Sequence, residues 1–161
     1  MLGRIGLGLI AALAVTGVAL AGEPRSALFG KGYNLCRAAS LSAVRRAAGQ
    51  PYRPGVFANG VCTWERPDLQ AGAALATHPP AAGASLMRSF LAQNGRNGVK
   101  AKRVVVAGAA RAVLVTMPGQ PGTVTRYLFA AYRPGTIQVN LTGPGPLASA
   151  RLVALVRLVA R

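Results

Sequence analysis

The sequence predicts an α+β fold: an antiparallel sheet packed by a short N-terminal helix, a middle helix and a C-terminal helix. Three observations carry this prediction. The chain has 161 residues, the length of one domain. It is 52% hydrophobic and 14% charged, which is typical of a packed globule rather than a disordered polycation. Its second half alternates apolar and polar residues between Gly- and Pro-containing turns, as antiparallel strands do.

The first 21 residues have the layout of a secretory signal peptide. Arg4 precedes an apolar run from residue 5 to 20, and Ala19 and Ala21 are the small residues that a signal peptidase reads. We therefore expect cleavage after Ala21 and a secreted or extracytoplasmic protein. No Cys follows the run, so we expect no lipoprotein. The alternative is a retained membrane anchor, because the run is close to the shortest length that spans a bilayer.

Behind the signal segment we expect a flexible lead-in over residues 22–33 and a single domain over residues 34–161. The first helix is predicted from Ser40, a capping residue, to Gly49, a stop signal, with Leu41 and Val44 on its apolar face. The apolar spacing and the turn residues predict the remaining elements, which are strands over 56–66 and 73–77, a helix over 84–93, strands over 103–107, 112–117, 124–132 and 136–142, and a helix over 147–161.

Export decides how the two cysteines, Cys36 and Cys62, are interpreted. Outside the cytoplasm an isolated pair favours a disulfide, which would stabilise the fold by about 3–4 kcal/mol. The alternative is a nucleophilic Cys, for which His78 is the one possible imidazole base. If Cys62 lies on a strand, the bridge ties the first helix to the sheet. Trp64 is then on the same strand face and is expected to pack beside the bridge.

The charge balance predicts anionic partners. The chain has 19 Lys and Arg residues against 3 acidic ones, a net charge of +16. Such a surface attracts anions over long range in a salt-sensitive way. We expect an anionic cell-wall polymer or an acidic lipid surface, with a small apolar ligand between sheet and helices as an alternative. Export makes nucleic acid an unexpected partner. The candidate binding residues are Lys100, Lys102, Arg103, Arg151, Arg157 and Arg161.

The C-terminal helix allows two interpretations. Four apolar side chains fall on one side of the helical wheel and three arginines in the opposite arc, namely Leu152, Leu155, Val156 and Val159 against Arg151, Arg157 and Arg161. The helix is expected to close the core. The alternative is a cationic helix that lies on an anionic membrane, as in membrane-active or toxin-like proteins.

The small number of acidic residues and the single histidine argue against catalysis. The acidic residues are Glu23, Glu65 and Asp68, and the single imidazole is His78. A Ser/His/acid triad from His78 and Asp68 lacks a Gly-x-Ser-x-Gly elbow. Metal binding through His78, Glu65 and Asp68 lacks any ligand spacing. We expect no enzyme activity, no catalytic residues, no metal and no cofactor.

A family resemblance adds to this interpretation. Cys36, the short helix with Leu41 and Val44, Gly60-Val61-Cys62-Thr63-Trp64 and Val106-Ala107-Gly108 occur in this order. The pattern resembles small exported domains of unknown function that are common in actinobacteria, often lipoproteins, and the architecture resembles the PsbP-like α/β sandwich. The resemblance spans about residues 34–161 and implies a Cys36–Cys62 disulfide and a binding or sensory role. It implies no catalytic residue. The absent lipid-modified Cys and the acid-poor surface are departures from the pattern.

Overall fold

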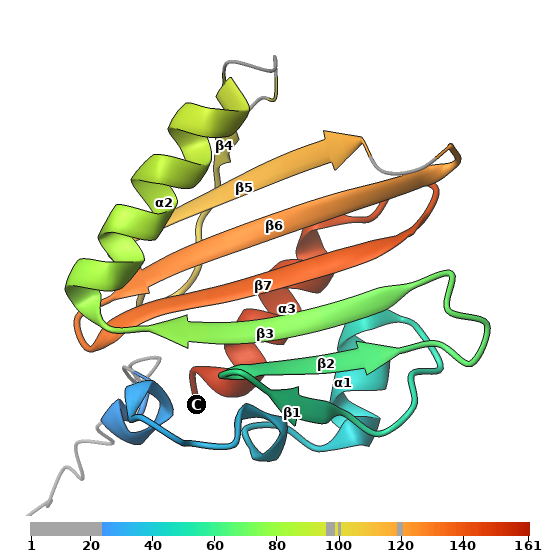
Figure 1. The fold of residues 1–161 in the computed structure, drawn as a ribbon, viewed down its shortest axis with the longest axis horizontal. Helices are drawn as coiled ribbons and strands as arrows, with labels where there is room; N and C mark the ends of the chain where they lie inside the picture. The colour runs from blue at the N-terminus through green and yellow to red at the C-terminus, as the bar shows by residue number, and fades with distance from the viewer. Residues whose placement is uncertain (1–23, 96–98, 100, 119–120) are drawn as a thin grey trace, which may run out of the picture.

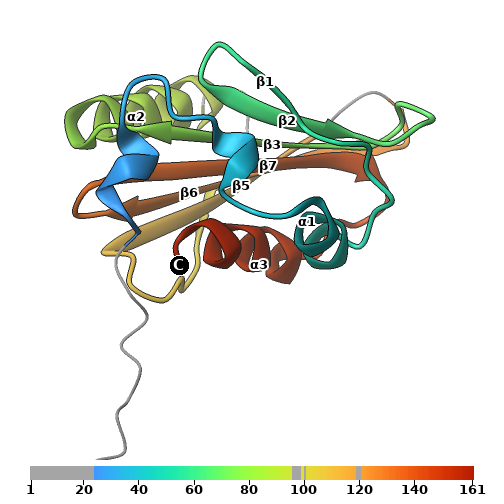
Figure 2. The ribbon, with the colours of Figure 1, turned by 90° about the horizontal axis from the view of Figure 1, so that it is seen from below.

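The computed structural model describes residues 24–95, 99, 101–118 and 121–161. These residues form a seven-stranded antiparallel sheet with the strand order β1-β2-β3-β7-β6-β5-β4. Helix α2 crosses one face of the sheet, and α1 and α3 lie together on the other face (Figures 1 and 2). The predicted fold class, α+β with three helices on an antiparallel sheet, is therefore confirmed.

The elements follow one another along the chain as η1 (Ser26–Phe29), η2 (Leu35–Arg37), α1 (Leu41–Ala48), β1 (Val56–Ala58), β2 (Val61–Glu65), β3 (Gly72–His78), α2 (Pro80–Gly95), β4 (Ala101–Arg103), β5 (Arg111–Pro118), β6 (Thr123–Tyr132), β7 (Gly135–Pro144) and α3 (Ser149–Val159). After β3, helix α2 carries the chain across the sheet to its far edge, where β4 lies. The chain then forms the antiparallel β5-β6-β7 meander, which returns to pair β7 with β3.

The two faces of the sheet bury two apolar clusters. On the face of α1 and α3, alternate strand residues such as Leu75, Leu128 and Val139 pack against both helices. On the face of α2, a smaller cluster surrounds Phe129 and Met87. The rings of Phe90, Tyr127 and Phe129 are in contact there, with centroids 4.9–6.5 Å apart in the three pairs. The larger cluster includes the buried side chains of α3, and it therefore anchors this helix to the sheet.

The predicted strand over 56–66 is instead a hairpin of β1 and β2. Asn59 and Gly60 form its turn with φ values of 51° and 78°, so both residues have left-handed backbone conformation. An Asn-Gly pair is the preferred sequence for a two-residue hairpin turn because both residues tolerate positive φ. The prediction of one continuous strand is wrong for this reason.

Helix α1 begins and ends at its predicted capping residues. The Ser40 hydroxyl accepts a hydrogen bond from the Ala43 amide at 3.3 Å, and Gly49 ends α1 with a φ of 64°. Helix α2 begins at Pro80, earlier than predicted, because proline suits the first turn of a helix. Helix α3 is shorter than predicted at both ends.

The valine run beyond β4 is not a strand. The sequence predicts a strand over residues 103–107, yet β4 ends at Arg103. The Val104 amide still donates to the Ala112 carbonyl, after which the chain turns through Gly108, whose φ is 76°. The β-branched residues favour a strand, but at this edge the turn takes the chain out of the ladder. Val105 is left 90% exposed.

The predicted lead-in is in part folded. Residues 26–29 form η1, and the Leu28 side chain is buried in the larger cluster. The predicted signal segment and its cleavage site lie outside the described residues. None of the helices in the described segments is long and apolar enough to cross a membrane.

The predicted disulfide between Cys36 and Cys62 is present, with Cα atoms 5.2 Å apart. Cys36 lies in η2, so the bridge ties this turn, rather than α1, to β2. Trp64 is 4% exposed, and its indole nitrogen and both sulfur atoms surround Gly55 so closely that a Cβ there would come within 3.0 Å of each. The prediction that Trp64 packs beside the bridge is confirmed.

Candidate functional site

Helix α3 has one buried side and one open side. The apolar side chains predicted for its inner face are all buried against the sheet, namely Leu152, Leu155, Val156 and Val159. Its other side carries the small Ala150 and Ala154 and, in the last turn, Arg157. Arg161 lies two residues beyond the end of the helix, on the same surface. Because the alanines are short, this side of the helix forms a shallow floor with cations at its C-terminal end.

Helix α1 and the β4 segment complete the lining of a groove. Val44 and Ala48 bury one side of α1, which leaves Arg46 on the side that faces the groove. Lys102 pairs with Leu114, whose side chain belongs to the cluster under α3, so strand alternation places Lys102 on the groove side. Arg103 pairs with Val113, which belongs to the cluster under α2, and therefore lies at the rim.

The groove has a volume of about 920 Å³. Its floor and walls are largely apolar, with Ala43, Ala47, Val104, Val105, Ala150, Val153, Ala154 and Leu158 among the lining residues. We call Arg46, Lys102, Arg157 and Arg161 the groove cations. They share an open surface with apolar side chains, an arrangement suited to a ligand that has an anionic group and some apolar surface.

In the part of the chain that the structure describes, no ion pair neutralises the groove cations. Across the described ranges, no side-chain hydrogen bond or ion pair holds any of them. Glu65 belongs to β2 and Asp68 pairs with Arg66, so neither carboxylate lies in the groove. Burial raises the pKa of Tyr132, and nearby Arg157 partly opposes this rise, so the side chain beside Arg157 is a neutral phenol. The cations therefore repel one another in a groove that no described side-chain carboxylate lines.

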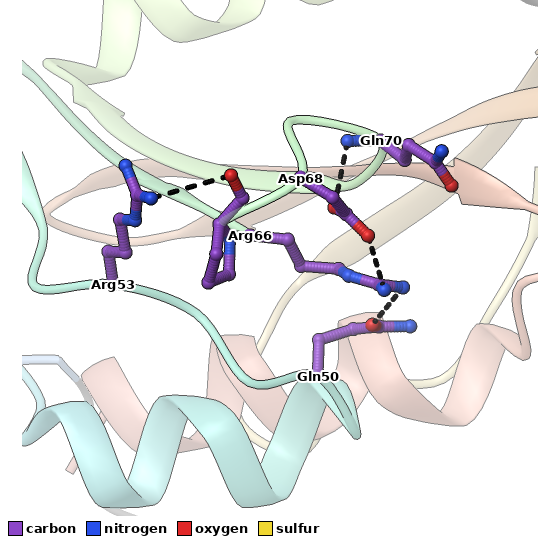
Figure 3. A network of polar contacts seen from close by, with 6 residues as sticks. Gln50, Arg53, Arg66, Asp68 and Gln70 are labelled. Carbon is purple, nitrogen blue, oxygen red and sulfur yellow. Dashed lines mark hydrogen bonds and ion pairs between the residues drawn. The ribbon is translucent and has the colours of Figure 1, made fainter.

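Arginines at the β2–β3 turn show the opposite situation (Figure 3). The Arg66 guanidinium donates to Asp68 at 2.6 Å and to Gln50 at 3.2 Å, which joins the turn to the end of α1. Asp68 also accepts from the Gln70 amide at 3.1 Å, and Arg53 donates to the carbonyl of Pro67 at 3.4 Å. This network is a structural clamp: its cation is neutralised within the chain.

The structure brings together part of the predicted set of binding residues. Lys102, Arg157 and Arg161 line the groove and Arg103 lies at its rim. Lys100 lies outside the described residues. Arg151 is placed elsewhere: its guanidinium packs over Gly49, where a Cβ would come within 3.1 Å of Cζ.

Arg46 is the groove cation that the sequence prediction missed. A wheel drawn for α1 puts it opposite Val44, but the signal needed was that α1 packs beside α3, as their contacts show. Nothing within a single helix carries that information.

The residues considered for catalysis are far apart. His78 ends β3, where its Nε2 is hydrogen-bonded to Gln138 Oε1 at 3.1 Å. Asp68 precedes the other end of β3 and is held by Arg66. At about 3.3 Å per residue, a seven-residue strand separates the two by roughly 20 Å. They do not form a triad, and the described residues contain no cluster of His, Cys, Asp or Glu that could hold a metal ion.

The space between the sheet and the α1–α3 layer is almost filled. A void there, lined by Val44, Trp64, Leu75 and Val139 among others, has a volume of about 10 Å³. That is about the space for one water molecule. An apolar ligand of larger size has no room there in this conformation, so the open groove is the better candidate site.

No protein-family model matches the chain, and no curated protein matches it either.

Proposed function

We propose that the chain is an exported, disulfide-stabilised binding domain of the cell envelope, without catalytic activity, that binds anionic groups in the α1–α3 groove. One observation carries this proposal. Arg46, Lys102, Arg157 and Arg161 converge on one open surface, and none of them has a partner among the described residues. Arginine forms paired hydrogen bonds with phosphate or carboxylate, so such a site suits either anion.

Electrostatics supply both attraction and selectivity at this site. The four like charges raise the local potential, and a bound polyanion relieves their mutual repulsion. Because the groove cations are exposed, the attraction weakens as salt shortens the Debye length. Binding is therefore expected to fall steeply between low and physiological ionic strength.

Export is part of the same proposal. The Cys36–Cys62 bridge supports it, because disulfides persist mainly in oxidising compartments. The expected signal segment, residues 1–21, supports it from the sequence. A mass spectrum of the protein secreted by its host should match residues 22–161 with the bridge intact, whereas a mass that retains residue 1 would contradict processing.

The alternative of a membrane-inserting C-terminal helix has less support. Leu152, Val156 and the other apolar residues of α3 are buried against the sheet, so insertion would require the helix to leave the core. Losing a core helix exposes several large apolar side chains, each worth about 1.5–3 kcal/mol. The groove cations, in contrast, reach a ligand without any such rearrangement.

Two variants of equal charge test the proposal. The groove variant combines Arg46→Gln, Lys102→Gln, Arg157→Gln and Arg161→Gln. The control variant combines Arg25→Gln, Lys31→Gln, Arg88→Gln and Arg133→Gln, four exposed cations outside the groove. Both remove one lysine and three arginines, so they differ only in where the charge is lost.

The probe is inorganic polyphosphate, a soluble polyanion with no apolar part, titrated at about 0.15 M salt. We expect the groove variant to bind at least about tenfold more weakly than the unmodified protein, and the control variant less than about threefold more weakly. Equal weakening of the two variants would contradict the proposal, because it would assign binding to net charge rather than to the groove.

A further inference from the structure

Val105, an apolar residue at the groove, has an unusually exposed side chain. Val105 is 90% exposed, more than Leu69 at 70% and Val56 at 65%, the other large apolar side chains that stand out in the described part of the chain. It belongs to the lining of the groove and follows directly on the segment that carries Lys102 and Arg103. A valine left in water gains free energy when it enters an apolar phase.

The position of Val105 matters because of what surrounds it. Apolar side chains of the groove, including Val104 and Val153, lie next to cations that form no ion pair within the described segments. A polymer of phosphate groups would satisfy the cations and leave the apolar surface in water. The surface of a bilayer that contains acidic phospholipid satisfies both, because phosphate and acyl chains lie within a few ångströms of each other there.

We propose that the groove docks on acidic phospholipid at a bilayer surface, with the groove cations on the phosphates and Val105 inserted among the first acyl carbons. This inference rests on the function proposed above and narrows its ligand to a phospholipid surface. Docking leaves the fold intact: α3 remains packed on the sheet, and the β4–β5 loop is the part that enters the bilayer.

Val56 provides a matched control within the same sheet. Val56 lies on β1 and Val105 follows β4, and these two strands are the opposite edges of the sheet. Both valines are largely exposed, so Val105→Ser and Val56→Ser make the same chemical change at opposite edges without opening a cavity. Neither substitution alters charge.

The test is sedimentation of the protein with vesicles of phosphatidylcholine containing about one-third phosphatidylglycerol. Val105→Ser should weaken partitioning about five- to tenfold and Val56→Ser should leave it unchanged. Val105→Leu should strengthen it about threefold, because one more methylene is buried. Inorganic polyphosphate has no apolar part, so its binding measures the groove cations separately, and a loss of polyphosphate binding by Val105→Ser as large as its loss of vesicle binding would contradict insertion of Val105 into the bilayer.

The outcomes separate this inference from the proposed function. Equal vesicle binding by the two serine variants, or no binding to acidic vesicles at all, would overturn lipid docking, while polyphosphate binding that needs the groove cations would leave the proposed function in place. Release of a dye trapped in the vesicles would also overturn docking, because it would indicate insertion of a helix rather than a single loop.

Discussion

The β2–β3 turn and the α1–α3 groove use arginine in opposite ways. At the turn, Arg66 is held by Asp68 and Gln50, and its charge is neutralised within the chain (Figure 3). In the groove, Arg46, Arg157 and the other groove cations form no ion pair or side-chain hydrogen bond with any of the described residues. The first arrangement stabilises the fold, whereas the second slightly destabilises it, because like charges repel in the absence of a ligand.

The difference shows how a chain with so few carboxylates distributes its charge. An acid-poor sequence can neutralise few of its arginines internally, and the structure does so where the β2–β3 turn meets the end of α1. The groove cations remain available. Substitutions near the turn are therefore expected to change stability, and substitutions in the groove are expected to change binding.

The largest expected effect is the loss of folding stability when the disulfide is removed. Replacing both Cys36 and Cys62 with Ala should lower the free energy of unfolding by about 3–4 kcal/mol, because the unfolded chain regains the freedom of the closed loop. Denaturant unfolding measures the loss. Polyphosphate binding by the folded fraction should be unchanged, and a parallel loss of binding affinity would mean that the bridge also shapes the groove.

The next largest expected effect is a fall in the free energy of unfolding at alkaline pH, caused by Tyr52. Burial raises the pKa of Tyr52 from 10.0 to about 12, although Arg151 and Arg66 oppose the rise. A folded-state pKa above the unfolded one stabilises the fold fully below pH 10, and this stability is lost as the pH rises through 12. The loss amounts to about 2 kcal/mol.

Tyr52→Phe is the control for this titration, since phenylalanine carries no proton. Urea unfolding followed from about pH 9 to 12 should show a flatter alkaline decline in the variant than in the unmodified protein. Identical pH profiles would contradict the assignment of the decline to Tyr52.

The smallest effect compares the two kinds of arginine directly. Arg66→Gln should lower the free energy of unfolding by about 1 kcal/mol, because Asp68 and Gln50 lose their partner in a partly exposed site. Arg157→Gln should change it by less than about 0.5 kcal/mol, with a slight increase favoured by reduced repulsion. Thermal unfolding at low salt measures both, and a larger loss from Arg157→Gln would break the comparison.

Much of the fold could be predicted because its local signals agree with its tertiary contacts. Ser40 and Gly49 bound α1, and the alternation around Ile137 and Val139 marks β7. The errors occurred where one signal competed with another. The valines after Arg103 favour a strand, but the chain turns out of the sheet edge through Gly108. The Asn59-Gly60 turn was a readable signal that the prediction overlooked.

The site could be predicted only where its residues share one element. Arg157 lies in the last turn of α3 and Arg161 follows two residues after its end, so their closeness in the sequence brings both to one end of the groove. Arg151 lies about 120° around the helix from Arg157, at 100° per residue, and this offset carries it toward Gly49. Arg46 joins the groove through the packing of α1 beside α3, which no periodicity within either helix reveals.

The central claim is that the groove, rather than the overall charge, receives the anion. Hydrogen exchange of backbone amides with and without inorganic polyphosphate tests it most directly. We expect added protection to concentrate in α1, in residues 102–105 and in α3, with the exposed arginines elsewhere, such as Arg88 and Arg133, unaffected. Protection spread evenly over all cationic surfaces, or concentrated around Arg88 on α2, would contradict the claim.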